Sequence, residues 1–120
     1  NETEGCALTG EQEPKRIMRA LLSRYPEMQV VLTLGGEGAM MGGGEQLLHQ
    51  PCFRVKTVDT TAAGDTFTGY FAAAVLEGKN AQDALRLAAA AAALAVSEEG
   101  AAVSIPVRQQ AETLLKKSGY

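Results

Sequence analysis

Residues 58–67 form the most informative segment of the chain and are Val58-Asp59-Thr60-Thr61-Ala62-Ala63-Gly64-Asp65-Thr66-Phe67. The pattern predicts the end of a strand, then a turn of small residues, then a helix that begins near Gly64 or Asp65. The first N–H groups of a helix lack a partner within it, and the helix dipole makes that end partially positive. Because Ala62, Ala63 and Gly64 have almost no side chain, a phosphate could approach the backbone there.

Asp65 stands on the first turn of this predicted helix, beside the predicted anion site. A carboxylate in that place could accept a proton from a hydroxyl that attacks a bound phosphate. The alternative is that Asp65 only caps the helix and that the alanines only fill space. Residue spacing does not separate these two interpretations.

Helix and strand patterns alternate along the first half of the chain. Apolar residues at helical spacing predict an amphipathic helix over residues 14–24. The β-branched run of residues 29–34 predicts a buried strand. Residues 39–41 and 46–49 are expected to form a hairpin around the glycines of residues 42–44.

The second half predicts one more strand and three helices. Residues 53–58 alternate between apolar and polar and predict the strand. In the helix that follows, Phe67, Phe71 and Val75 recur every four residues and are expected on one buried face.

Two further helices are expected, over the alanine-rich residues 81–97, closed by Gly100, and over residues 106–117. A helix with so few bulky side chains can pack very close to a sheet or to a planar ligand. Strands joined by turns in one part and by helices in another indicate an α/β domain with a mixed sheet flanked by helices.

Composition excludes several classes of function. The chain has 120 residues, which suits one small domain, and its net charge of −3 gives no reason to expect nucleic acid or a membrane as a partner. The single histidine, His49, argues against zinc hydrolases and a Ser-His-Asp triad. Cys6 and Cys52 are expected to be reduced thiols of a cytoplasmic protein, with a disulfide left open.

The segment from Asp59 to Asp65 closely resembles a signature of the ribokinase-like (PfkB-type) carbohydrate kinases, Asp-Thr-x-Gly/Ala-Ala-Gly-Asp. Phe67 and Gly69 continue the pattern, whereas Tyr70 departs from it because the family usually has a small residue there. In that family the last Asp is the catalytic base, which the resemblance assigns to Asp65. The preceding small residues form the anion hole, and they are Ala62, Ala63 and Gly64 here.

Two other segments are similar to family motifs in the expected order. Asn1-Glu2-Thr3-Glu4 is similar to an Asn-x-x-Glu motif, which implies that Glu4 helps to place Mg²⁺ through water and that Asn1 lies near the nucleotide phosphates. Residues 33–38 resemble the strand-and-glycine segment along the nucleotide, which implicates Thr33, Gly35, Gly36 and Gly38. A solvated surface and a plain turn are the alternatives, and no Walker A sequence follows.

Residues 95–104 are similar to the family segment near the adenine and a monovalent cation. The resemblance implies a K⁺ site made by Asp59 and Ser104, with main-chain oxygens of Thr61, Ala95 and Gly100. The alternative is that Gly100 is a helix C-cap and that Ser104 is a surface residue.

The resemblance implies a ribokinase-like, three-layer Rossmann-type α/β fold, with residues 1–120 as the C-terminal nucleotide-binding and catalytic portion. The N-terminal sugar-binding half and the lid are absent from this sequence. The implied reaction is Mg²⁺-dependent transfer of the ATP γ-phosphoryl group to a sugar hydroxymethyl, with K⁺ as activator. The sequence of residues 59–67 is especially similar to that of ribokinases, which favours ribose as the substrate. Fructokinase-like and nucleoside kinases share most of this sequence. A homodimer of the full-length protein stays open.

Two other classes of function remain. One is a nucleotide-binding module without catalysis, against which the intact Asp59 and Asp65 argue. The other is a structural α/β domain that binds no ATP. A different Rossmann-type anion binder is disfavoured, because no GxGxxG follows a first strand.

Overall fold

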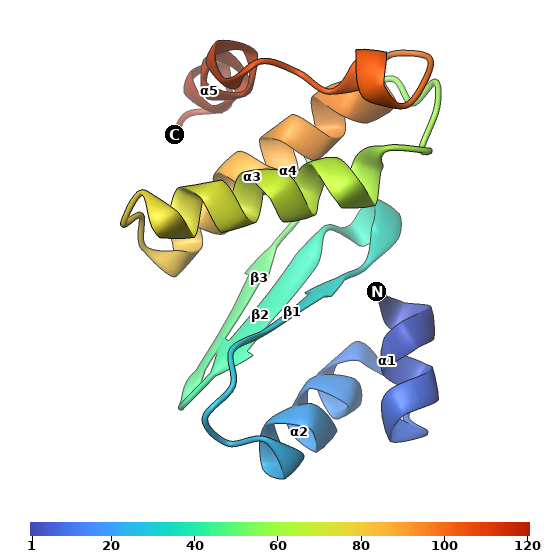
Figure 1. Ribbon diagram of the computed structural model, residues 1–120, viewed down its shortest axis with the longest axis vertical. Coiled ribbons are helices and arrows are strands. Elements are labelled where there is room, and N and C mark those ends of the chain that lie inside the picture. The colour runs from blue at the N-terminus through green and yellow to red at the C-terminus, as the bar shows by residue number, and fades with distance from the viewer. The chain divides into compact units, whose positions relative to one another are not determined.

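The computed structural model describes all 120 residues, and the chain divides into two compact units, Asn1–Pro51 and Cys52–Tyr120. Figure 1 labels the helices and strands of both units. None of the helices combines the length and the apolar content of a membrane span.

The first unit is an antiparallel sheet of order β1-β2-β3 that packs against two helices (Figure 1). The helices are α1 (Glu2–Thr9) and α2 (Pro14–Arg24). The strands are β1 (Val30–Thr33), β2 (Ala39–Gly43) and β3 (Gln46–Gln50), with a 3₁₀ turn, η1 (Gly35–Glu37), between the first two. The expected helix, strand and hairpin are therefore confirmed to within a residue or two.

Apolar residues that alternate along β1 and recur along α2 meet in the core of this unit. Ile17 and Met18 are almost fully buried and pack with Leu32, Leu34 and Met40. The three strands pair only in antiparallel fashion, so this chain does not itself contain the parallel pairs of a mixed sheet. The sequence analysis does not predict helix α1, since it assigns Asn1-Glu2-Thr3-Glu4 to a ligand motif.

The second unit is built around the alanine-rich helix. Its elements are α3 (Ala63–Leu76), α4 (Ala81–Val96), η2 (Ala102–Ser104) and α5 (Arg108–Lys117). Helix α4 packs against both α3 and α5. Ala74 of α3, Ala84 and Ala91 of α4, and Ala111 of α5 have no exposed surface. The small side chains of α4 thus allow other helices to approach it closely. The expected partner was a sheet or a planar ligand, and the observed partners are α3 and α5.

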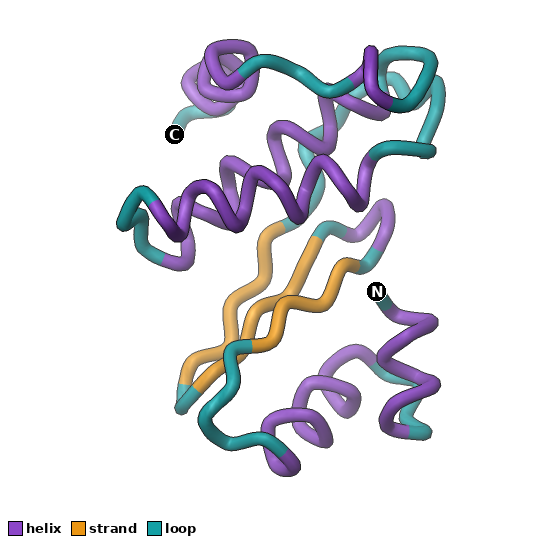
Figure 2. The backbone as a smooth tube through the Cα atoms, viewed as in Figure 1, coloured by secondary structure: helices purple, strands orange, loops and turns teal.

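Three expectations for this unit are wrong. Residues 53–58 form no strand (Figure 2), because no strand pairs with them; instead the N–H of Val58 donates to Val96 O at 2.7 Å. Of the residues expected on the buried face of α3, Phe67 and Phe71 are buried or partly buried, whereas Val75 is 46% exposed. Gly100 does not close α4, which already ends at Val96 with Ser97 as its C-cap.

The alanine contact between α3 and α4 yields a stability prediction. Ala74→Leu should lower the free energy of unfolding by about 1–3 kcal/mol, because a larger side chain does not fit a site with no free surface. Ala72→Leu is the matched control, since Ala72 is exposed on the same helix. Urea denaturation of both variants checks this, and equal stabilities would contradict the packing.

Candidate active site

The start of α3 is open, as the anion-site hypothesis requires. No side chain caps the helix after Ala62, and the N–H of Ala63 donates to Thr60 O at 3.2 Å. The N–H groups of Gly64 and Asp65 belong to the first turn, where a helix supplies no carbonyl partner. They are the two donors that an anion at this helix end would meet first.

Gly64 is a glycine that nothing within the chain requires. Its φ is not positive, and a Cβ built on it would meet no heavy atom within 4 Å. Glycine in a helix costs roughly 0.5–1 kcal/mol relative to alanine. A glycine at this place is consistent with the close approach of a molecule from outside the chain.

Asp65 is an exposed residue at the third position of α3. Asp83 occupies the same position of α4, where its N–H and carboxylate both bond the side chain of Asn80 at 2.9 Å. Asp65 has no such partner, because Ala62 stands where α4 has Asn80. The helix-cap interpretation is therefore weaker for Asp65 than for Asp83, and the Asp65 carboxylate is available for chemistry.

Asp59 ties the loop before α3 to a distant segment. Its Oδ1 accepts from the N–H of Thr61 at 2.9 Å and from the Thr61 hydroxyl, and its Oδ2 accepts from the N–H of Gly100 at 3.2 Å. These hydrogen bonds, first those of Thr61 and then that of Gly100, lower the pKa of the Asp59 carboxyl. The structure thus brings together three of the five residues implied in K⁺ binding.

The other two residues implied in K⁺ binding, Ala95 and Ser104, make no hydrogen bond to Asp59. The N–H groups of Val58 and Asp59 donate to the carbonyl of Val96, the residue after Ala95. Ser104 is 3% exposed, which contradicts the surface alternative, and its hydroxyl donates to Ala101 O at 2.7 Å.

Carboxylate, hydroxyl and main-chain carbonyl oxygens are the ligands that a hard cation takes. The contacts that Thr61 and Gly100 make with the Asp59 carboxylate are made by their N–H groups and by the Thr61 hydroxyl. No group of three or more His, Cys, Asp or Glu side chains is arranged to hold a metal ion.

Residues 34–38, here called the glycine loop, connect β1 to β2 in the first unit. Thr33 is the last residue of β1 and pairs with Ala39 across the loop. Gly35 and Gly38 have φ of +55° and +98°, values that favour glycine over other residues. Gly36 has no positive φ, and a Cβ on it would meet nothing within 4 Å. The turn interpretation explains Gly35 and Gly38 but leaves Gly36 unexplained.

Asn1 and Glu4 form a capping box at the start of α1. Asn1 Oδ1 accepts from the N–H of Glu4 at 3.0 Å, and Glu4 Oε2 accepts from the backbone nitrogen of Asn1 at 2.8 Å. The two residues are exposed, so this local role and a role in placing Mg²⁺ compete for the same oxygens.

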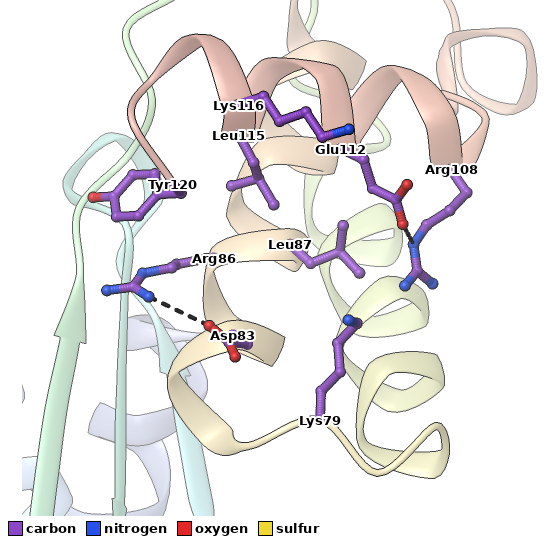
Figure 3. Close-up of a pocket in the computed structure, with 9 residues that line it drawn as sticks. All are labelled: Lys79, Asp83, Arg86, Leu87, Arg108, Glu112, Leu115, Lys116 and Tyr120. Carbon is purple, nitrogen blue, oxygen red and sulfur yellow. Dashed lines mark hydrogen bonds and ion pairs between the residues drawn. The ribbon is translucent and has the colours of Figure 1, made fainter.

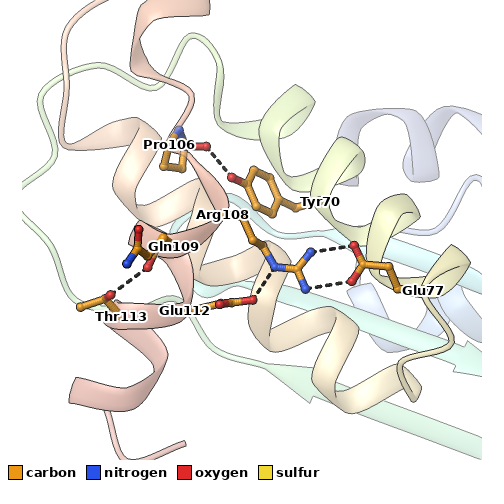
Figure 4. A network of polar contacts seen from close by, with 7 residues as sticks. All are labelled: Tyr70, Glu77, Pro106, Arg108, Gln109, Glu112 and Thr113. Carbon is orange, nitrogen blue, oxygen red and sulfur yellow. Dashed lines mark hydrogen bonds and ion pairs between the residues drawn. The ribbon is translucent and has the colours of Figure 1, made fainter.

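A network around Arg108 was missed by sequence reasoning (Figure 4). Its guanidinium donates to both oxygens of Glu77 at 2.9 Å and to Glu112 Oε1 at 2.7 Å, which raises the pKa of Arg108 and lowers that of Glu77. The Tyr70 hydroxyl donates to Pro106 O, and burial raises the pKa of Tyr70. The departure of Tyr70 from the family pattern was the one signal of this contact.

Several hollows lie in the second unit. One adjoins Asp65 and is lined by Gly69, Tyr70 and Ile105 among others. Another lies between α4 and α5, with Leu87 and Leu115 as its apolar lining (Figure 3). It contains none of the predicted site residues, and four of its charged side chains form the pairs Arg86–Asp83 and Arg108–Glu112.

The Asp59 contacts predict a pH dependence of stability. Because the pKa of Asp59 is lowered in the folded protein, its stabilisation is present above the ordinary value of 3.8 and is lost as pH falls through the folded value. Asp59→Asn should therefore be less stable than the parent at neutral pH, with the difference shrinking below pH 3.8. Urea denaturation across this range, with Glu98→Gln as control, checks this; a difference that does not change with pH would contradict it.

Known proteins match the chain in sequence and in structure. The model of the pfkB family carbohydrate kinases matches residues 1–108. A ribokinase of Arabidopsis thaliana is 42% identical over 124 residues, covering 98% of this chain and 33% of the relative. The solved Arabidopsis thaliana ribokinase, complexed with ribose and ATP, has a TM-score of 0.89 at 41% identity and covers 97% of this chain and 39% of that one.

A protein described as ribokinase II from E. coli, solved with ATP and Mg²⁺, has a TM-score of 0.87 at 29% identity, over 97% of this chain and 37% of that one. The chain spans about a third of the length of the curated relatives that it matches. The expected ribokinase-like α/β fold is confirmed by these structures. The family match and the identities show that the chain belongs to the pfkB family of carbohydrate kinases.

Proposed function

We propose that this chain is the nucleotide-binding and catalytic portion of an ATP-dependent sugar kinase, and that its sugar is ribose. The observation that carries the proposal is the uncapped start of α3 with Asp65 exposed on its first turn. The ribokinase relatives support ribose as the substrate. Fructokinase-like and nucleoside substrates are the alternatives within the family, and a non-catalytic nucleotide-binding module is the alternative outside it.

In the proposed reaction Asp65 accepts the proton of the sugar hydroxymethyl as its oxygen attacks the γ-phosphorus of ATP. The bond from that phosphorus to the bridging oxygen breaks, and ADP leaves. The N–H groups of Gly64 and Asp65 donate to the phosphoryl oxygens on which charge develops. Mg²⁺, when bound, supplies positive charge to the phosphates.

The remaining assignments follow the family pattern. Thr33, Gly35, Gly36 and Gly38 are proposed to contact the nucleotide, and Asn1 and Glu4 to act near the phosphates and Mg²⁺. Ala62 and Ala63 supply the small surface of the anion hole. We further propose a K⁺ site at Asp59, Thr61, Ala95, Gly100 and Ser104. A cytoplasmic location and a homodimer of the full-length protein stay predictions.

The base assignment is tested by Asp65→Asn in the full-length protein that contains this chain. Turnover should fall by about 10²–10⁴-fold while ATP still binds, because an amide cannot accept the proton. Asp83→Asn is the matched control, since Asp83 holds the same helix position and should keep its turnover. Steady-state kinetics on a panel of pentoses, hexoses and nucleosides measures both. A near-normal rate in Asp65→Asn refutes the assignment.

The K⁺ site is tested by Ser104→Ala. This variant should raise the K⁺ concentration for half-maximal activity, because a hydroxyl oxygen is removed from the proposed ligand set. Ser97→Ala is the matched control: both hydroxyls donate to the carbonyl three residues earlier at 2.7 Å, so a loss of local structure would affect both variants. The measurement is kinase activity as a function of KCl concentration at constant ionic strength, for the parent and both variants. Equal responses of the two variants, or a parent enzyme indifferent to K⁺, would contradict the site.

A further inference from the structure

His49 contacts the glycine loop from a different strand. Its Nε2 lies 3.0 Å from the carbonyl oxygen of Glu37, twelve residues earlier in the chain. A carbonyl can only accept, so Nε2 must carry a proton and donate it. His49 lies on β3 opposite Met40 of β2, and Glu37 is the last residue of η1.

Three backbone hydrogen bonds lie within the glycine loop. Leu34 donates to Gly38 O at 2.8 Å, Glu37 donates to Leu34 O at 3.1 Å, and Gly38 donates to Gly35 O at 3.2 Å. Such bonds shape the loop, and the buried side chain of Leu34 anchors its start in the core of the first unit. The His49 contact adds a connection from the tip of the loop to β3, the strand that does not flank it.

We propose that His49 is a positioning residue for nucleotide binding, which holds the glycine loop in the orientation that binds ATP. This rests on the proposed function, in which Gly35, Gly36 and Gly38 contact the nucleotide. His49 acts through the Glu37 carbonyl and does not itself touch the ligand. A loop that is ordered before binding loses less conformational freedom when the nucleotide arrives, so affinity is higher.

A purely structural role is the competing explanation, because His49 is exposed on the outer strand of the hairpin. The geometry of two substitutions separates the explanations. The side-chain amide nitrogen of Gln can occupy the position of the His Nε2, whereas that of Asn corresponds to Nδ1 and stops short of Glu37. His49→Gln should therefore preserve the contact, while His49→Asn and His49→Ala should lose it.

The experiment uses the full-length protein that contains this chain. ATP binding is measured by calorimetry with Mg²⁺ and without sugar, and KM is measured separately for ATP and for ribose. In His49→Asn and His49→Ala the ATP dissociation constant and the KM for ATP should rise about two- to ten-fold, the effect of one hydrogen bond. The KM for ribose should stay constant, and His49→Gln should remain within about two-fold of the parent.

Hydrogen exchange gives a readout that does not depend on activity. Without nucleotide, the amides of residues 34–38 should exchange faster in His49→Asn and His49→Ala, but not in His49→Gln. Lower thermal stability with an unchanged ATP dissociation constant would show a structural role and overturn the inference. So would a His49→Gln variant as impaired as His49→Asn.

Failure of the inference is distinguishable from failure of the proposed function. If sugars are phosphorylated but no His49 variant changes the ATP dissociation constant or the KM for ATP, the inference fails and the proposed function stands. If ATP binds in a His49-dependent way but no sugar is phosphorylated, the kinase proposal fails and the inference stands. Absence of ATP binding in the parent protein overturns both.

Discussion

The arrangement of the second unit depends most on the Asp59 carboxylate. It accepts hydrogen bonds from Thr61 on one side and from Gly100 on the other, across 41 positions of sequence. These bonds connect the loop before α3 to Gly100, beyond the end of α4. The start of α3, with its open N–H groups and Asp65, is oriented by the loop that Asp59 anchors.

Close helix packing supports this arrangement. Ala74, Ala84, Ala91 and Ala111 have no exposed surface, so α4 lies tight against its neighbours without large side chains between them. The Arg108–Glu77 pair at the C-cap of α3 and the Tyr70 hydrogen bond from the middle of α3 attach the start of α5 to the same helix. The helix that carries Asp65 is thus held along its length by packing and at its C-terminal end by charge.

Sequence patterns predicted the elements whose signal is local. The periodicity around Ile17 and Met18, and the glycines between β2 and β3, led to elements observed within a residue or two of their expected bounds. Residues 53–58 were misassigned, because an alternating pattern shows strand propensity but not whether a partner strand exists. Val75 was misplaced for a similar reason, since burial depends on the neighbour that a helix meets.

Residue identity and short spacing were enough to predict the family, the order of the motifs and the start of α3. The packed fold was needed to show that Gly100 donates to Asp59, that Ser104 is buried and that His49 contacts the carbonyl of Glu37. Each of these contacts joins or encloses residues that are distant along the chain, and a spacing pattern carries no information about such distances. Their geometry follows from the packing of whole helices and strands, which fixes the positions of side chains far apart in sequence.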